Sequence, residues 1–286
     1  MEVELIENTE RLSEIEKEWT LLLESSAQSD IFILPEWFFS WWEIYGGDKD
    51  LYTIALRKDR MLCGLLLLYK IKKGPFRLIT FTGAPCGSDQ MDFILMRNME
   101  DECITVFIEW LYKRSDWDIV SLRDFGPFTR NPEILFDKVT QQGERCHISR
   151  ELPSYYLPLD DYKDFDTYTK KTLSKNRKEQ LRKGRAGLKK LDNVEWELLD
   201  GINDKIVDEM KELDTVKSSR GLKGMSFFSD PKKGMFLNGL LSGKINSESI
   251  NLFCLRIGGK LVAYILNFKY MDRLLYYQAS FDKAYS

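Results

Sequence analysis

The sequence predicts a mixed α/β protein that is built from two similar halves. Stretches with helical spacing alternate with short strand-like stretches along the whole chain, as in α/β and α+β proteins. Two hairpin patterns also match when the numbering is shifted by 200, so that Asp59–Cys63 aligns with Gly259–Ala263. A length of 286 residues suits two domains. We therefore expect an internal duplication, with domains in residues 1–150 and 151–286.

The first half predicts three helices and four strands. Pro35 at the first position of its helix and Gly46-Gly47 at its end favour the second of these helices. The segment "RKDR" lies between two apolar runs, which is typical of a hairpin. In order, we expect helices over 10–24, 35–46 and 100–114, a hairpin over 51–71, and further strands over 77–83 and 117–125.

The second half predicts a variation on this plan. Gly258-Gly259 supplies the turn of its hairpin, and a proline stands near the start of its third helix. In order, we expect helices over 173–191, 202–221 and 230–243, a hairpin over 250–270 and a strand over 272–282.

Composition excludes several functional classes. Apolar residues make up 43% of the chain, which is enough for a core. With 42 basic and 45 acidic residues, the net charge of −3 argues against a general nucleic-acid binder. Five scattered cysteines without a CxxC pair indicate reduced thiols, and a single histidine argues against a metal site. We see no signal peptide or membrane span, so we expect a cytoplasmic protein.

Residues 170–190 hold ten Lys and Arg against one acid, Glu179. Ser174 is the expected N-cap of this helix. Arg177 falls on the stripe of Leu181 and Leu188, so it is expected to point inward, where it needs an anionic partner. Two interpretations stay open. Either Arg177 pairs with an internal carboxylate and the other cations are solvated, or the start of the helix binds an anionic ligand.

The last strand carries a polar row. Alternation over 272–282 places one set of polar side chains on one face, namely Tyr276, Gln278, Ser280 and Asp282. This row either lines a reaction site or forms a solvated face.

Four stretches carry a resemblance to a known family: "GAPCGSDQMDFIL", "LSKNRKEQLRKGRAGLKKL", "VKSSRGLKG" and the hairpin "LFCLRIGGKLVAYILNFKY". Together they resemble the CelD/BcsL acyltransferases, a branch of the GNAT superfamily. The wider resemblance extends to FemABX aminoacyltransferases, which consist of tandem GNAT-like units. It implies two such domains, each with a mixed sheet flanked by helices.

The resemblance also implies a reaction. Acetyl-CoA or another acyl-CoA would give its acyl group to a sugar or amino sugar, possibly nucleotide-linked, in envelope or exopolysaccharide synthesis. No metal is implied. The expected catalytic residues are Tyr276, Gln278 and Asp282. Lys175 and Arg177 would hold a phosphate of the donor or of the acceptor. The expected substrate contacts are Arg220 and Ser280.

The sequence departs from this family at the CoA site. The first half has no Gly-rich CoA loop, and Ser286 comes where the CoA-binding turn and helix of the second domain are expected. We therefore expect a first domain without a CoA loop and a second domain lacking its C-terminal CoA-binding helix in this chain. Two alternatives remain. One is a FemX-like aminoacyltransferase that uses aminoacyl-tRNA, the one nucleic acid retained as a partner, and the other is a non-catalytic GNAT scaffold or binding module.

Overall fold

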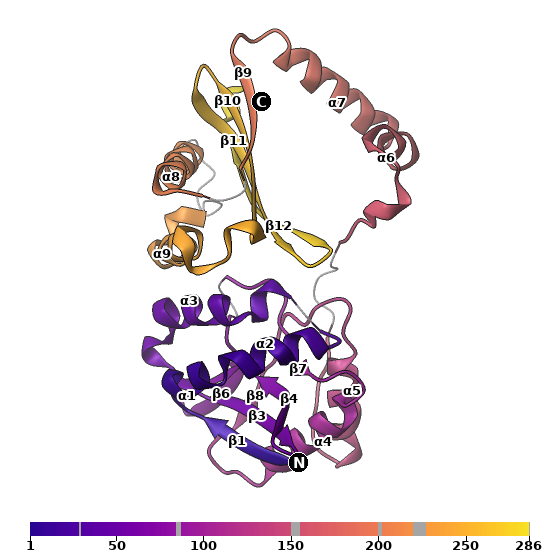
Figure 1. Ribbon diagram of the computed structural model, residues 1–286, viewed down its shortest axis with the longest axis vertical. Coiled ribbons are helices and arrows are strands. Elements are labelled where there is room, and N and C mark those ends of the chain that lie inside the picture. The colour runs from indigo at the N-terminus through magenta and orange to yellow at the C-terminus, as the bar shows by residue number, and fades with distance from the viewer. Residues whose placement is uncertain (29, 84–86, 150–154, 200–201, 220–226, 286) are drawn as a thin grey trace.

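The computed structural model describes residues 1–28, 30–83, 87–149, 155–199, 202–219 and 227–285. The N-terminal half forms one α/β body and the C-terminal half a second, which lies against it (Figure 1). Two helices, α6 and α7, stand apart from both bodies and form an arm beside the second sheet.

The described elements of the first half begin with a strand and two short helices. In order they are β1 (Glu2–Ile6), α1 (Thr9–Glu14), α2 (Glu16–Ser25), α3 (Pro35–Tyr45), β2 (Asp50–Leu51), β3 (Thr53–Lys58), β4 (Met61–Leu66), β5 (Leu68–Lys73), β6 (Phe76–Phe81), β7 (Ile94–Leu95), α4 (Glu100–Tyr112), β8 (Ile119–Val120) and α5 (Asn131–Gln141).

The described elements of the second half begin with the arm. In order they are α6 (Phe165–Thr172), α7 (Lys175–Leu188), β9 (Val194–Leu199), α8 (Asp204–Ser219), α9 (Pro231–Gly239), β10 (Ile250–Ile257), β11 (Lys260–Tyr270) and β12 (Arg273–Phe281). A final 3-10 turn, η7, covers Lys283–Tyr285.

The sheets are mostly antiparallel. Among the described residues, the first half holds two four-stranded sheets, in the orders β1-β3-β4-β7 and β2-β5-β6-β8, and the second half holds one sheet in the order β12-β11-β10-β9. The pair β6–β8 is parallel. The prediction of a mixed α/β fold is therefore confirmed, and so are both hairpins.

The duplication is visible in backbone detail. The hairpin turns hold left-handed residues at Asp59 and Arg60 in the first half and at Gly258 and Gly259 in the second. Each hairpin has a bulge just before its turn, at Leu56/Arg57 and at Leu255/Arg256. These features match at a shift of 199, so the predicted shift of 200 is wrong by one residue.

The returning strand of each hairpin also deviates at an equivalent place. In the first half the chain passes from β4 to β5 at Leu67 and so leaves one sheet for the other. In the second half β11 continues, but its register with β12 shifts between Leu266 and Asn267. The two sites are again 199 residues apart, so the returning strand departs from regular pairing at the equivalent position in each half, although in different ways.

An arginine clamp repeats as well. Arg57, at the first bulge, pairs with Glu18 on α2 and lies 3.7 Å from Glu4 on β1. Its counterpart Arg256 pairs with Glu197 on β9 and with Glu209 on α8. Each arginine also donates from Nη1 to a carbonyl of its own turn, over 3.2 Å in both cases. In each half, the arginine therefore joins the hairpin to an edge strand and to a helix, namely β1 and α2 in the first half and β9 and α8 in the second.

Replacing Arg57 by lysine is expected to lower the free energy of unfolding by about 1–2 kcal/mol, because one ammonium cannot make the forked contacts of a guanidinium. The Arg57 hydrogen bond holds the pKa of Glu18 below its usual range. The stabilisation is therefore complete above the unfolded pKa of glutamate, about 4.3, and is lost as the pH falls through the lower folded value. Urea unfolding at pH 7 and pH 3 measures both effects, and exposed Arg123→Lys is the control. Equal losses at both pH values would contradict this account.

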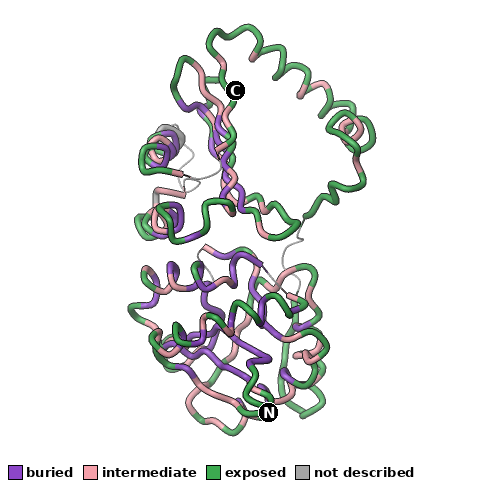
Figure 2. Tube along the Cα trace, viewed as in Figure 1, coloured by how far each residue is buried: buried purple, intermediate pink, exposed green. Residues whose placement is uncertain are grey.

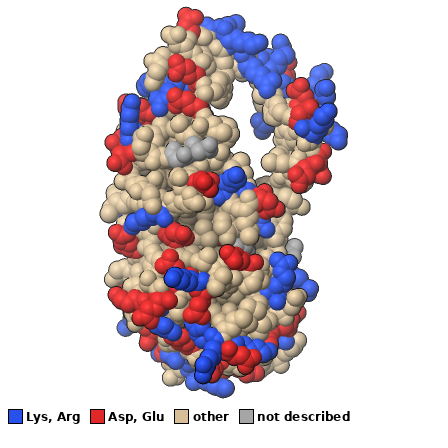
Figure 3. Space-filling view, in the orientation of Figure 1, with Lys and Arg blue, Asp and Glu red and all other residues tan. Residues whose placement is uncertain are grey.

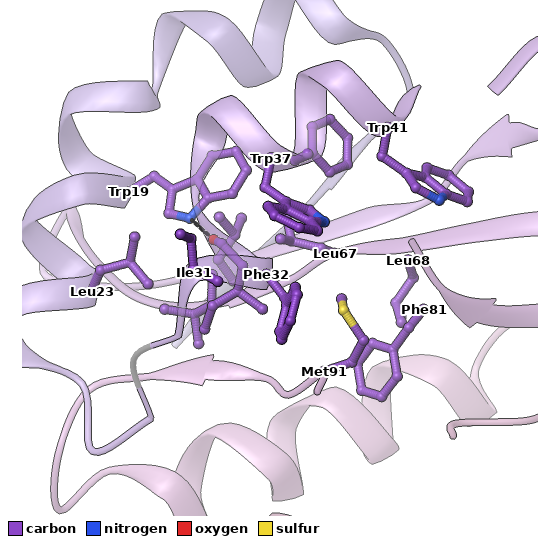
Figure 4. Close-up of a cluster of buried hydrophobic side chains, with 14 of the residues drawn as sticks. Trp19, Leu23, Ile31, Phe32, Trp37, Trp41, Leu67, Leu68, Phe81 and Met91 are labelled. Atoms are coloured by element: carbon purple, nitrogen blue, oxygen red, sulfur yellow. Dashed lines mark hydrogen bonds between the residues drawn. The ribbon is translucent and has the colours of Figure 1, made fainter. Parts of the chain in front are cut away.

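The main core lies in the first half and extends to the interface (Figure 2). Figure 4 shows Trp19, Phe32 and Trp37 from helical segments packed over residues of the strands, such as Leu68 and Phe81. The indole Nε1 of Trp19 donates to the carbonyl of Ile33 over 3.1 Å, so this buried polar group is satisfied. Trp41 is also buried, and it packs against Tyr45 and Tyr69.

Candidate functional site

The basic helix α7 is a surface element. Ser174 caps it as predicted, since its hydroxyl accepts from the Arg177 amide over 3.3 Å. The prediction that Arg177 points inward is wrong: its side chain is exposed, and Nη1 donates to Gln180 over 3.1 Å. The physical reason is that α7 has no core beneath its stripe. Leu181 and Leu188 are only half-buried.

Several cations of α7 have local partners. Arg182 makes a forked contact with Glu179, Lys178 donates to the Lys170 carbonyl, and Arg185 lies over the Phe165 ring. Figure 3 shows the Lys and Arg side chains gathered along this arm. Lys175 is exposed like Arg177, so both side chains are open to an anion from solvent.

The polar row on β12 is not a single face. Ser280 pairs with Tyr264 and Gln278 pairs with Leu266, whereas Tyr276 pairs with Asn267, the next residue of β11. Cross-strand partners share a face, so the bulge places Tyr276 opposite Gln278 and Ser280. The common face predicted for the row is therefore wrong. Tyr276 is exposed, and Ser280 is buried beneath α8.

Asp282 has a local structural role. It lies just after β12, is buried, and its Oδ1 accepts from the Ala284 amide over 2.9 Å, which caps the turn η7. Its own amide donates to the Val262 carbonyl over 2.8 Å. Arg220 lies outside the described residues.

A buried polar cluster lies where α8 covers β11 and β12, and we call it the α8 cluster: Asp214, Tyr264, Gln278 and Ser280. Asp214 and Tyr264 are fully buried, and the Tyr264 hydroxyl donates to Asp214 Oδ1 over 3.4 Å. The Gln278 side chain lies close enough to Tyr264 to lower the pKa of its phenol slightly, against the larger effect of burial. The Ser280 hydroxyl is buried without a hydrogen-bond partner among the described residues.

Burial shapes the chemistry of the α8 cluster. It raises the pKa of the Tyr264 phenol well above its usual range, and the neighbouring Asp214 carboxylate raises it further. Tyr264 is therefore neutral at neutral pH, and its hydroxyl donates to Asp214. Asp214 Oδ2 also accepts from the Phe227 amide over 3.0 Å. The cluster thus combines a buried carboxylate, a phenol and an amide, a set able to orient and deprotonate a polar acceptor.

Sequence reasoning missed Asp214, although a signal was present. Among the residues of α8 whose burial is described, the buried ones are Ile206, Val207, Met210, Leu213 and Asp214. Asp214 continues this helical stripe, so it is a charge where the pattern requires an apolar side chain. A charged residue on an apolar stripe is expected to point inward, which is wrong for Arg177 but correct for Asp214.

An aromatic wall joins the α8 cluster to the first half. Trp37 on α3 packs edge-on against Phe236, Phe268 and Tyr277 of the second half, with ring centroids 5.2–5.8 Å apart. We call these four rings the interrepeat wall. The Phe227 ring lies 5.8 Å from Tyr277 while its amide bonds Asp214, so the wall and the cluster are continuous.

A loop of the first half is fixed against this wall. The Trp37 indole donates to Ser88 Oγ over 2.9 Å, and the Tyr277 hydroxyl donates to the Gly87 carbonyl over 3.0 Å. Gly87 has φ +100°, and a Cβ there would lie 2.7 Å from the Phe236 ring. Only glycine fits this backbone and this approach.

Asp30 and Arg273 lie at the same junction. Asp30 is buried, which raises its pKa to about 6 although its carboxylate accepts from the Phe32 amide and feels the charge of Arg273. The Arg273 guanidinium lies 5.2 Å from the Phe128 ring centroid. The first and second halves therefore both contribute charged groups to the junction.

Asp92 lies on the loop that carries Ser88. It is buried, and its Oδ1 accepts from the Phe93 amide and from Asn131 Nδ2, each over 2.7 Å. Its Oδ2 is buried and lacks a hydrogen bond in the described part of the chain. Burial raises the pKa of this carboxyl to about 7.

Replacing Asp92 by asparagine is expected to remove a pH-dependent loss of stability. The folded pKa is raised, so stability is greatest below the unfolded value near 3.9 and is lost as the pH rises towards 7. The free energy of unfolding of Asp92→Asn relative to the unmodified protein should rise by roughly 2–4 kcal/mol between pH 4 and pH 8. Urea unfolding across this range measures it. Asp101→Asn, at an exposed carboxylate, is the control, and a parallel rise in the control would refute the assignment.

The acidic start of α4 distinguishes the first half from a phosphate-binding unit. Glu100, Asp101 and Glu102 all lie in the first turn of this helix, which follows β7. Three carboxylates at a helix start repel an anion that the helix dipole would attract. The residues present do not fit a CoA phosphate there.

The described residues contain no group of three or more His, Cys, Asp or Glu side chains placed to hold a metal ion. Among the helices of the described part, none is both long and apolar enough to cross a membrane.

Comparison with known proteins supports this architecture. Residues 175–286 match the Acetyltransf_6 family model, described as an acetyltransferase (GNAT) domain. A crystal structure of FemX is similar over 99% of this chain and 81% of that chain, with a TM-score of 0.61 and 12% identity. A conserved protein of unknown function from Bacteroides thetaiotaomicron VPI-5482 is similar over the same shares, with a TM-score of 0.53 and 12% identity. No curated protein matched the sequence.

At this identity the two structures establish the fold, and the family match supports the GNAT-like domain predicted in the second half. The matched segment contains the whole α8 cluster. Acyl transfer is therefore the general chemistry that the findings support, and they do not reach the narrower CelD/BcsL family.

Proposed function

We propose that this chain transfers an acyl group from acyl-CoA to a sugar or amino-sugar acceptor, as a CelD/BcsL-type enzyme of envelope or exopolysaccharide synthesis in the cytoplasm. The observation that carries the proposal is the GNAT match over residues 175–286, which spans the basic helix and the α8 cluster. The acceptor nitrogen or oxygen attacks the thioester carbonyl. The carbon–sulfur bond breaks, and the CoA thiol leaves with the proton that the acceptor gives up.

The α8 cluster is the proposed acceptor site. Asp214 accepts the proton of the acceptor, directly or through one water, while Tyr264 and Gln278 orient the reacting group. Ser280 remains a proposed substrate contact, because its hydroxyl is unpaired among the described groups. Of the other proposed catalytic residues, Tyr276 is on the opposite face, and Asp282 is held in a cap.

Lys175 and Arg177 remain the proposed contacts for a phosphate of the donor or of a nucleotide-linked acceptor. Both are exposed near the capped start of α7, where backbone amides also favour an anion. The acidic start of α4 argues against a second donor site in the first half.

Calorimetric titration with acetyl-CoA tests the donor assignment. We expect saturable binding that weakens at least fivefold in Arg177→Ala. Arg182→Ala should bind normally, because Arg182 lies on the same helix but is already paired with Glu179. Equal weakening in both variants would mean that acetyl-CoA responds to the overall positive charge of α7 and makes no specific contact with Arg177. Release of CoA thiol in the presence of a panel of amino sugars and sugars then tests turnover.

A second candidate is aminoacyl transfer from aminoacyl-tRNA, favoured by the fold shared with FemX over nearly the whole chain. It predicts turnover with aminoacyl-tRNA and none with acetyl-CoA. Saturable binding of acetyl-CoA without turnover of either donor would instead favour the non-catalytic binding module.

A further inference from the structure

The sheet of the second half has one covered and one exposed face. Helices α8 and α9 cover one side, and the arm formed by α6 and α7 stands off the other (Figure 1). Two apolar rows cross the exposed side strand by strand: Trp196, Leu255, Ala263 and Phe281 form one, and Leu198, Phe253, Ile265 and Ala279 form the other. We call these eight residues the outer face.

The outer face consists of apolar residues, yet much of it is exposed to solvent. Trp196 is 67% exposed and Phe281 is 46% exposed, and Leu198, Phe253 and Ile265 are exposed as well. A contiguous apolar patch of this kind on a sheet normally has a covering element.

The arm carries a complementary stripe. Leu181, Gly184 and Leu188 follow one another at helical spacing on α7, and a Cβ on Gly184 would meet nothing within 4 Å. Glycine at the centre of such a stripe allows the helix backbone to approach a sheet closely. Among the described residues, neither α6 nor α7 packs extensively against another element.

The connection between arm and sheet is short. Asn193, with φ +54°, accepts at its carbonyl from the Gly258 amide over 3.0 Å, which fixes the start of β9. Only residues 189–192 lie between this anchor and α7. A helix joined to a strand by so few residues usually packs on the face of the sheet that contains that strand.

We infer that the arm closes over the outer face, with α7 lying antiparallel to β9. Leu188, nearer the connector, then covers the row of Trp196, and Leu181, about 10 Å further along the helix, covers the row of Phe253. The arm is attached to the body at both ends, so closure within one chain has a high effective concentration and is favoured over exchange between chains. This inference does not depend on acyl transfer.

Disulfide trapping tests the closure in the full chain. With Cys86 and Cys146 replaced by serine, Leu181→Cys is combined with Ile265→Cys and oxidised with copper phenanthroline. The control combines Ala186→Cys, on the opposite side of α7, with the same Ile265→Cys. Closure predicts that the first pair cross-links within one chain at least tenfold faster than the control, because a disulfide needs Cα atoms within about 7 Å.

Equal rates for the two pairs, no cross-link in either, or cross-links only between chains would each overturn the inference. Circular dichroism verifies that both double variants are folded. If Leu181→Cys disturbs the helix, Gly184→Cys with Phe253→Cys probes the same closure, since Gly184 has free space around it.

Discussion

Trp37→Ala is expected to lower the free energy of unfolding by about 3–5 kcal/mol, because it removes the central ring of the interrepeat wall. Trp37 is 1% exposed, and three of its ring contacts are with residues of the second half. The substitution also leaves the Ser88 hydroxyl without its indole donor. Urea unfolding followed by circular dichroism measures the loss.

Two further variants separate the contributions of Trp37. Trp37→Phe keeps a ring in the wall but loses the hydrogen bond to Ser88, so we expect a smaller loss of about 1–2 kcal/mol. Tyr155→Ala changes an aromatic ring that is 91% exposed and should stay within about 0.5 kcal/mol of the unmodified protein. A loss below about 1 kcal/mol for Trp37→Ala would contradict the wall as the main contact between the halves.

The hairpins and most helices could be predicted because their signals are local. Apolar runs around a turn, as at "RKDR" and Gly258-Gly259, give both hairpins, and Pro35 gives the start of α3. The sequence of "EVELI" in β1 and "VEWELL" in β9 alternates glutamate with apolar residues, and both strands lie at the edge of their sheets. Such short, charged edge strands lack a clear pattern, and both were missed.

The strand predicted over 117–125, by contrast, is longer than the strand in the structure. Only Ile119 and Val120 form strand β8, with an isolated bridge at Phe125. Asp118 is held by a forked contact with Arg77 just before β8. Apolar alternation alone therefore overestimated the strand, because pairing with β6 ends after two residues.

The prediction that the polar residues of β12 share one face was wrong for a physical reason that alternation cannot reveal. Strict alternation assumes one residue per rung of the sheet, but the register shift opposite Leu266 and Asn267 leaves Tyr277 as an additional residue. Tyr277 therefore turns towards Trp37 and Phe268, and Tyr276 moves to the outside. The position of a bulge depends on both strands, so one strand's sequence did not reveal it.

The wall itself depends on contacts between distant segments. Trp37 has an ordinary place on an amphipathic helix, and only the packing of the two halves shows that its neighbours are Phe236 and Tyr277. The stripe on α8, by contrast, was readable from local spacing. A buried charge is informative where a core exists to bury it, which separates Asp214 from Arg177.

Asp214→Asn is expected to reduce acyl transfer by about 10²–10⁴-fold, because the amide keeps the size of the side chain but cannot accept the acceptor's proton. Release of CoA from acetyl-CoA, with the acceptor that turns over, measures the rate. The free energy of unfolding should fall by only about 1–3 kcal/mol, since the bonds to Phe227 and Tyr264 are partly kept.

Asp208→Asn is the matched control, because Asp208 lies on the same helix but is exposed and pairs with Lys211. It should leave the rate unchanged. A purely structural Asp214 would lose activity only in proportion to the unfolded fraction. A proton acceptor would lose far more activity than that fraction in the asparagine variant, because the amide cannot take up the proton. The rate and the stability together therefore separate a carboxylate that supports the fold from one that takes part in the reaction.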